Sequence, residues 1–132
     1  MKERNDLVRG WLRKAESDLV AMDASLKAGA MDAACFHAQQ AAEKCLKAYL
    51  TSLEAAFPYT HNLNKLIELC SRVDPGFKDL ADQADSLNPY AVQLRYDIEF
   101  WPDEEHAQQA RTTAVAIRNF VLARIPFKVP DS

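Results

Sequence analysis

The chain has 132 residues, of which 48% are hydrophobic and 27% charged, and 16 basic against 19 acidic side chains give a formal net charge of -3. This length fits one domain with its own core over residues 1–132, and the composition excludes a disordered chain. The small negative charge excludes a general nucleic-acid coat protein, although a local RNA-binding groove remains compatible with it.

The first predicted helix covers about residues 6–28. Its apolar side chains recur at steps of three and four residues, which is typical of an amphipathic helix with one buried stripe. Gly29 then supplies a C-terminal stop. The predicted stripe consists of Leu7, Trp11, Ala15, Leu19, Met22 and Leu26.

The second predicted helix covers about residues 31–55 and ends before Phe57 and Pro58. It contains an alanine-rich run from Phe36 to Leu50 of mostly strong helix formers. Small side chains allow neighbouring helices to approach closely, so we expect this helix to be the central element of the fold. The alanine-rich face also favours a homodimer.

The third predicted helix begins after Thr60, which can cap it, and carries an apolar stripe. Asp74, Pro75 and Gly76 have turn chemistry and end it. A fourth apolar pattern follows and breaks at Asn88 and Pro89. The two stripes are Leu63, Leu66, Ile67, Cys70 and Val73, and then Phe77, Leu80, Ala81 and Ala84.

Residues 90–96 are predicted to form a short helix, and the last helix begins after Pro102 with acidic residues that complement its dipole. Nothing alternates with a period of two, so strands are not expected. The predicted fold is therefore all-α, an up-and-down antiparallel bundle of four long helices plus a short one. The last helix should bury Ala107, Ala110, Ala114, Ile117, Val121 and Ile125.

Three cysteines, Cys35, Cys45 and Cys70, all lie in apolar helical patterns. An odd count without short spacing indicates reduced, buried thiols in a reducing compartment. The chain lacks a secretory signal pattern at its N-terminus and a long apolar run, so we expect a cytoplasmic protein that does not enter a membrane.

The usual catalytic and metal-binding patterns are missing from the sequence. A di-iron bundle needs Glu-x-x-His motifs, and the chain has none. It also lacks a Gly-x-Ser-x-Gly elbow and a glycine-rich phosphate loop. We therefore expect no metal site and no cofactor.

Three histidines remain as candidates. His37 faces either the bundle or a partner subunit, and His61 stands at a helix start. Both are candidate binding residues, and the alternative for each is a packing, capping or hydrogen-bonding role. His106 lies among acidic residues at the start of the last helix, where a surface role is the alternative.

Arginines suggest a small anion site. Arg111 and Arg118 are seven residues apart and share one face of the last helix, and Arg95, next to Tyr96, would complete the set if it folds back. Guanidinium groups match phosphate geometry. The alternative is a solvated face, with these arginines paired to Asp97, Glu99 or Glu104.

The chain resembles the HEPN domain family, named for higher eukaryotes and prokaryotes nucleotide-binding. The resemblance covers nearly the whole chain. It rests on four segments in this order: Trp11 with Ala15, Asp18 and Leu19; Phe36 to Lys44; Thr60 to Leu63; and Arg95 with Tyr96.

The resemblance implies a helical bundle that commonly dimerises and is often encoded beside a minimal nucleotidyltransferase as a toxin and antitoxin pair. Nucleotide or RNA contact is implied as well. Many members are metal-independent ribonucleases, whose motif is an arginine followed after four to six residues by a histidine.

This chain departs from that motif, because ten residues separate Arg95 from His106 and no arginine stands in the six residues before His61. The leading hypothesis is therefore a dimeric interaction module with a nucleotidyltransferase partner and without catalysis. A metal-independent ribonuclease toxin using Arg95 with His106 or His61 is the first alternative. A structural adaptor without a nucleic-acid role is the second.

Overall fold

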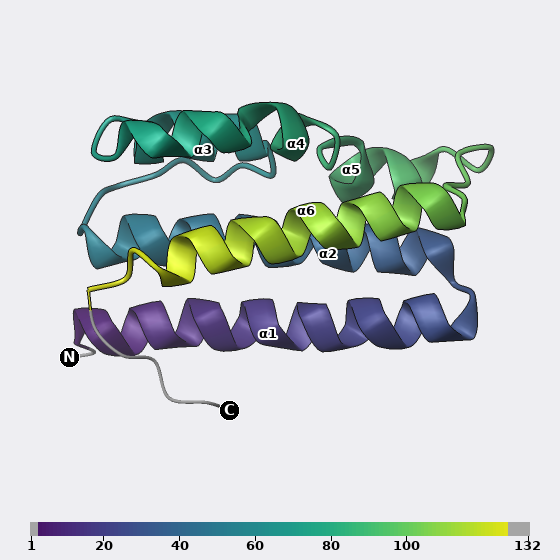
Figure 1. The fold of residues 1–132 in the computed structure, drawn as a ribbon, viewed down its shortest axis with the longest axis horizontal. Helices are drawn as coiled ribbons and strands as arrows, with labels where there is room; N and C mark the ends of the chain where they lie inside the picture. The colour runs from purple at the N-terminus through teal and green to yellow at the C-terminus, as the bar shows by residue number, and fades with distance from the viewer. Residues whose placement is uncertain (1–2, 127–132) are drawn as a thin grey trace.

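A computed structural model describes residues 3–126 of the chain, and this part is all-helical (Figure 1). The helices are α1 (Arg4–Ala28), α2 (Met31–Ser52), α3 (Leu63–Ser71), the 3-10 helix η1 (Pro75–Leu80), α4 (Ala81–Asp85), α5 (Pro89–Tyr96) and α6 (Glu104–Leu122). The predicted fold class is confirmed. The third predicted helix is short, at nine residues, and the next pattern is divided between η1 and α4.

Helix α2 is the centre of the bundle. It packs most extensively against α1 and then α6, and it also contacts α3 and α5. Figure 1 shows α1 along one side of α2 and α6, with the short helices from α3 to α5 along the other side. Small side chains do allow this close packing. The fully buried alanines of α2 are Ala34, Ala38, Ala41, Ala42 and Ala48.

The buried stripe of α1 differs from the prediction at its N-terminal end. Val8 and Leu12 are buried, whereas Leu7 is 47% exposed and Trp11 is only partly buried. The expected burial of Leu7 was therefore wrong. From Ala15 onward the predicted stripe holds, because the spacing of the next apolar residues keeps them on the side that faces α2.

Two helix ends use left-handed backbone. Gly29 has φ of 81°, and hydrogen bonds from Gly29 to Leu26 and from Ala30 to Ser25 close the end of α1 as predicted. Helix α2 ends at Ser52, earlier than predicted, because Glu54 adopts φ of 57° and gives the same pattern of hydrogen bonds. Sequence rules that look for glycine miss this end.

The predicted burial of Val73 was also wrong, because the chain leaves α3 before it and leaves it 60% exposed. All six predicted core residues of α6 and its C-terminal extension are buried. No helix within residues 3–126 is long and apolar enough to cross a membrane.

Candidate functional site

Glu43 is a buried carboxylate at the centre of a polar cluster on α2. It is 3% exposed. Its Oε2 accepts a hydrogen bond from Lys47 Nζ at 2.9 Å, and its Oε1 accepts one from His61 Nδ1 at 2.8 Å and one from Gln39 Nε2 at 3.3 Å. Three donors therefore compensate the desolvation of one carboxylate, which is the condition under which a buried charge is tolerated.

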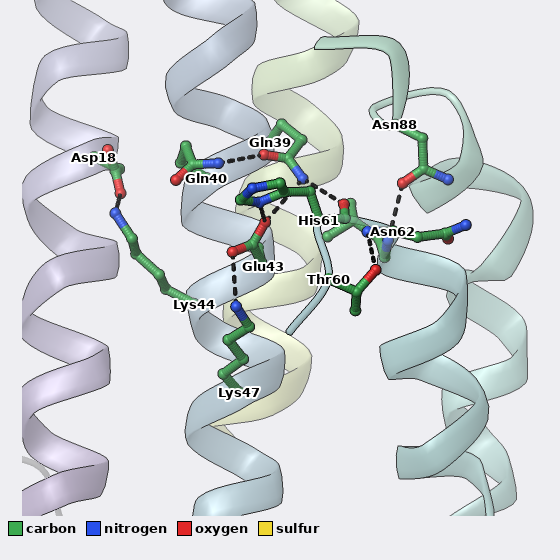
Figure 2. A network of polar contacts seen from close by, with 11 residues as sticks. Asp18, Gln39, Gln40, Glu43, Lys44, Lys47, Thr60, His61, Asn62 and Asn88 are labelled. Atoms are coloured by element: carbon green, nitrogen blue, oxygen red, sulfur yellow. Dashed lines mark hydrogen bonds and ion pairs between the residues drawn. The ribbon is translucent and has the colours of Figure 1, made fainter. Parts of the chain in front are cut away.

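The same cluster fixes the backbone before α3 (Figure 2). Gln39 is fully buried, and its Nε2 also donates to the carbonyl oxygen of His61 at 2.9 Å, while its Oε1 accepts from Gln40 at 2.7 Å. His61 is thus held by α2 through its ring and through its backbone. The long irregular connection from α2 to α3 is anchored by polar contacts at this residue.

Lys47 lies among aromatic rings as well as beside Glu43. Its Nζ is 5.6 Å from the ring centre of Trp11 and 5.9 Å from those of Phe57 and Tyr59. These distances are within the range of cation–π attraction. The ammonium group therefore ties α1 and the connection after α2 to the central helix.

A second carboxylate repeats the arrangement at the interface of α1 and α2. Asp18, whose side chain is 11% exposed, accepts hydrogen bonds from His37 Nδ1 at 2.9 Å and from Lys44 Nζ at 2.5 Å. Each carboxylate is therefore shared by one imidazole and one ammonium group. His37 is a partly buried residue with a charged partner, which its sequence context did not reveal.

The start of α3 is capped by Asn62. Its side-chain oxygen accepts from the backbone N–H groups of Asn64 and Lys65, while the hydroxyl of Thr60 accepts from the N–H of Asn62. The prediction that Thr60 caps this helix was wrong by two residues. Asn88 Oδ1 accepts from the N–H of Leu63, so the residue at the predicted break before α5 also supports the start of α3 (Figure 2).

The two arginines of α6 are paired with α1. Arg111 Nε is 2.8 Å from Asp23 Oδ1, and Arg118 Nε is 2.6 Å from Glu16 Oε1. The expected alternative partners, Asp97, Glu99 and Glu104, are not the ones used by these two side chains. Both guanidinium groups hold α6 against α1.

Arg95 and His106 belong to separate local arrangements. The guanidinium carbon of Arg95 lies 4.9 Å from the ring centre of Phe36. His106 is exposed, and its Nδ1 is 2.6 Å from Asp103, the residue that caps α6. The pKa of Asp103 is lowered mainly by a hydrogen bond from the backbone N–H of His106 and secondly by one from the ring of His106. Within residues 3–126, no direct contact joins Arg95 to His106.

The thiols are buried and chemically protected. Burial raises the pKa of Cys35 to about 11, and it raises the pKa of Cys45 and of Cys70 to about 12. All three are free cysteines. Because the thiolate is the reactive form, these residues are poor nucleophiles at neutral pH. In the described part of the chain, no group of three or more His, Cys, Asp or Glu side chains is placed to hold a metal ion.

Large apolar side chains are exposed on α5 and on the link from α5 to α6. We call Val92, Tyr96, Ile98 and Trp101 the α5–α6 surface, and their exposed fractions are 50%, 77%, 86% and 70%. In Figure 1 this link projects beyond the end of α5. Single exposed apolar residues are ordinary, and these four stand out because they lie within ten residues of chain.

Sequence reasoning missed the two carboxylates and their lysines. A signal was present, because Glu43 and Lys47 are four residues apart on a helix whose other neighbouring positions, apart from Lys44, are alanine, cysteine and leucine. A pair of opposite charges on an otherwise apolar arc predicts a buried ion pair. Asp18 gave a weaker signal, because its partners come from another helix.

The chemical capacity of the polar cluster is limited by its own contacts. Glu43 fixes one ring nitrogen of His61, and the His61 side chain is 42% exposed. A carboxylate that orients an imidazole is one element of general acid–base catalysis. No serine, threonine or cysteine hydroxyl or thiol is hydrogen-bonded to this ring among the described residues, so the cluster has no nucleophile of its own.

Comparison with protein families and solved structures gives consistent matches. The model of the HEPN domain matches residues 8–125. The crystal structure of TT1696 from Thermus thermophilus is similar, with 30% identity, a TM-score of 0.78 and coverage of 89% of this chain and 97% of that chain.

Two further structures are similar to the chain. ST0689, an archaeal HEPN homologue, is 26% identical with a TM-score of 0.73, covering 95% of this chain and 99% of its own. The HEPN domain protein TM0613 from Thermotoga maritima is 26% identical with a TM-score of 0.69, covering 87% of this chain and 96% of its own. A comparison with curated proteins gave no match.

Proposed function

Because the chain belongs to the HEPN domain family, we propose that it is a protein interaction module that forms a homodimer and pairs with a minimal nucleotidyltransferase. In this proposal the pair acts as a toxin and antitoxin, and contact with a nucleotide or RNA is secondary. The protein works in the cytoplasm and carries no cofactor.

The exposed α5–α6 surface is the observation that carries this proposal. Tyr96 and Trp101 are 77% and 70% exposed. Tyrosine and tryptophan are among the residues that contribute most to the binding energy of protein interfaces. Leaving such rings in water is unfavourable by an amount that scales with their apolar area. A partner that covers them would recover this free energy.

The contacts of the candidate histidines and arginines also support an interaction module without catalysis. His37 and His61 are each bound to a buried carboxylate, and Arg111 and Arg118 are each paired with α1. These side chains hold the bundle together. Their contacts account for their presence without a substrate.

The oligomeric state and the pairing can be measured directly. Light scattering of the purified protein should give a mass of about 30 kDa, twice the 14.9 kDa of one chain. A minimal nucleotidyltransferase from the same genome, co-expressed with this chain, should co-purify with it at micromolar concentration. The mass of a single chain at high concentration would refute the dimer, and failure of co-purification would refute the pairing.

A metal-independent ribonuclease is the second candidate, and one contact favours it. Glu43 orients the ring of His61, whose side chain remains 42% exposed, so this imidazole is the best-placed base for a 2'-hydroxyl of RNA. Cleavage of RNA in EDTA that is lost in His61→Ala and Arg95→Ala would establish this function. Intact RNA after incubation with the dimer would exclude it.

The structural adaptor is distinguished by the same two variants. It predicts that His61→Ala and Arg95→Ala change only the stability of the protein, because an adaptor of this kind has no role in RNA binding or cleavage. His61→Ala should then lower the melting temperature more than Arg95→Ala, because His61 has the buried partner.

A further inference from the structure

We propose that the α5–α6 surface is the docking site for a protein partner whose contact face presents lysine and arginine side chains around an apolar recess. This inference rests on the proposed function, because it names the surface and the partner chemistry through which the interaction module works. Its acidic rim would repel the same rim of a second copy, so we assign this surface to a different protein and not to the homodimer contact.

The centre of the surface is apolar and aromatic. Ile98 and Trp101 have 86% and 70% of their surface exposed, and Val92 and Tyr96 lie four residues apart on α5, which places them on one face of that helix. The other large apolar side chains that are exposed lie elsewhere: Leu7 and Val20 on α1, Leu53 and Tyr59 in the connection from α2 to α3, and Val73 after α3. The concentration of aromatic area on this one segment is the pattern of an interface centre.

The link is ordered by its own hydrogen bonds. Asp97 accepts from the N–H of Phe100 through its carbonyl at 3.0 Å and from the N–H of Glu99 through its side chain at 3.1 Å. The indole of Trp101 donates to the carbonyl of Ile98 at 2.9 Å. The protruding side chains are therefore held by a turn before any partner arrives, which lowers the entropic cost of binding.

Phe100 anchors this turn to the bundle. Its ring is stacked on Tyr90, with ring centres 6.0 Å apart and an interplanar angle of 16°, and it packs against the core. The residues on either side of it are exposed. The turn thus presents Ile98 and Trp101 from a fixed base.

The rim of the surface is acidic. Residues 96–110 contain no lysine or arginine, and five exposed carboxylates lie between positions 97 and 105. The basic residue just before this stretch, Arg95, is exposed, and its guanidinium carbon lies 4.9 Å from the ring centre of Phe36. Such a rim attracts a basic protein face and repels phosphate groups, so it favours a protein over RNA as the occupant. The carboxylates are Asp97, Glu99, Asp103, Glu104 and Glu105.

The test measures binding of the full chain to an immobilised minimal nucleotidyltransferase from the same genome, the partner class of the proposed function. We expect Trp101→Ala to weaken binding at least tenfold. The double variant Glu99→Lys with Glu104→Lys should weaken binding at least fivefold at 50 mM salt. The affinity of the unmodified chain should fall between 50 and 300 mM salt, and the affinity of the double variant should fall less over the same range. Asp97 and Asp103 are left in place because they order the turn and cap α6.

Matched controls come from α3 and the residues after it. Val73→Ala removes a 60% exposed apolar side chain, and Glu68→Lys reverses an exposed charge. Both should bind like the unmodified chain, and thermal unfolding followed by circular dichroism should show that all variants are folded. A Trp101 variant that unfolds is replaced by Ile98→Ser, which leaves the indole in place and has the same expected loss.

Three outcomes decide the matter. If the unmodified chain binds and the α5–α6 variants bind equally well, the docking surface is wrong and the proposed function stands. If the unmodified chain does not bind at 100 µM, the pairing and the docking surface both fail. If a 20-nucleotide single-stranded RNA binds the chain and Trp101→Ala weakens that binding tenfold, the surface is a nucleic-acid site and the inference is overturned.

Discussion

Replacing Glu43 with alanine should destabilise the protein more than any other single loss of a carboxylate that we describe. The variant leaves the ammonium group of Lys47 in a site where its side chain is 7% exposed, without the oxygen that lies 2.9 Å away. Removing one partner of a buried ion pair costs about 3–5 kcal/mol. Domains of this size unfold with about 5–15 kcal/mol, so the variant loses a large share of its stability.

Urea unfolding followed by circular dichroism at 222 nm measures this loss. Glu16→Ala is the matched control, because Glu16 is paired with Arg118 at 2.6 Å but is 36% exposed, and we expect it to cost at most about 1 kcal/mol. If Glu43→Ala does not fold, Glu43→Gln keeps the size of the side chain and still removes the charge.

A double-mutant cycle shows whether the ion pair is the cause. Lys47→Met combined with Glu43→Gln removes both charges, so the double variant should be more stable than the sum of the single losses predicts, by about 1–3 kcal/mol. Additive losses would show that Glu43 and Lys47 do not act as a pair. A loss below about 1 kcal/mol for Glu43→Ala would refute the reasoning altogether.

Three further changes test the helix ends and the thiols. Gly29→Ala should lower the free energy of unfolding in urea by about 1 kcal/mol, because φ is 81° at this position. Glu54→Gly should raise the free energy of unfolding by up to about 1 kcal/mol, because φ is 57° there. Changes of the opposite sign would contradict the assignment of these helix ends. Burial raises the thiol pKa values to about 11 and 12, so unfolded thiols ionise first and stability should fall as pH rises above about 9. Urea midpoints measured from pH 8 to 10.5 check this, and the fall should be smaller in Cys45→Ala.

The sequence was sufficient for the fold class because helical periodicity is local. The spacing of Ala15, Leu19 and Met22 on α1, and of the core residues of α6, could be read without knowing which helix they meet. The errors lie at the ends. Leu7 and Val73 satisfy the spacing and are exposed, because the neighbouring helix does not cover those positions.

The polar cluster could be predicted only in part. Glu43 and Lys47 are neighbours on one helix, so their pairing follows from a spacing of four residues. The contact of His61 with Glu43 joins positions 18 residues apart across an irregular connection, and the contact of His37 with Asp18 joins two helices. Such contacts depend on the packing of elements, which one sequence does not specify.

The placement of Phe100 has a consequence for how proteins of this kind diverge. Phe100 packs on the bundle, whereas the side chains of Ile98 and Trp101 are exposed, so the core constrains Phe100 and places little constraint on the other two. Trp101 also donates a hydrogen bond within the turn. Substitutions at positions 98 and 101 can accumulate without loss of the helical framework. Recognition at this surface can therefore change between lineages while the helical framework persists.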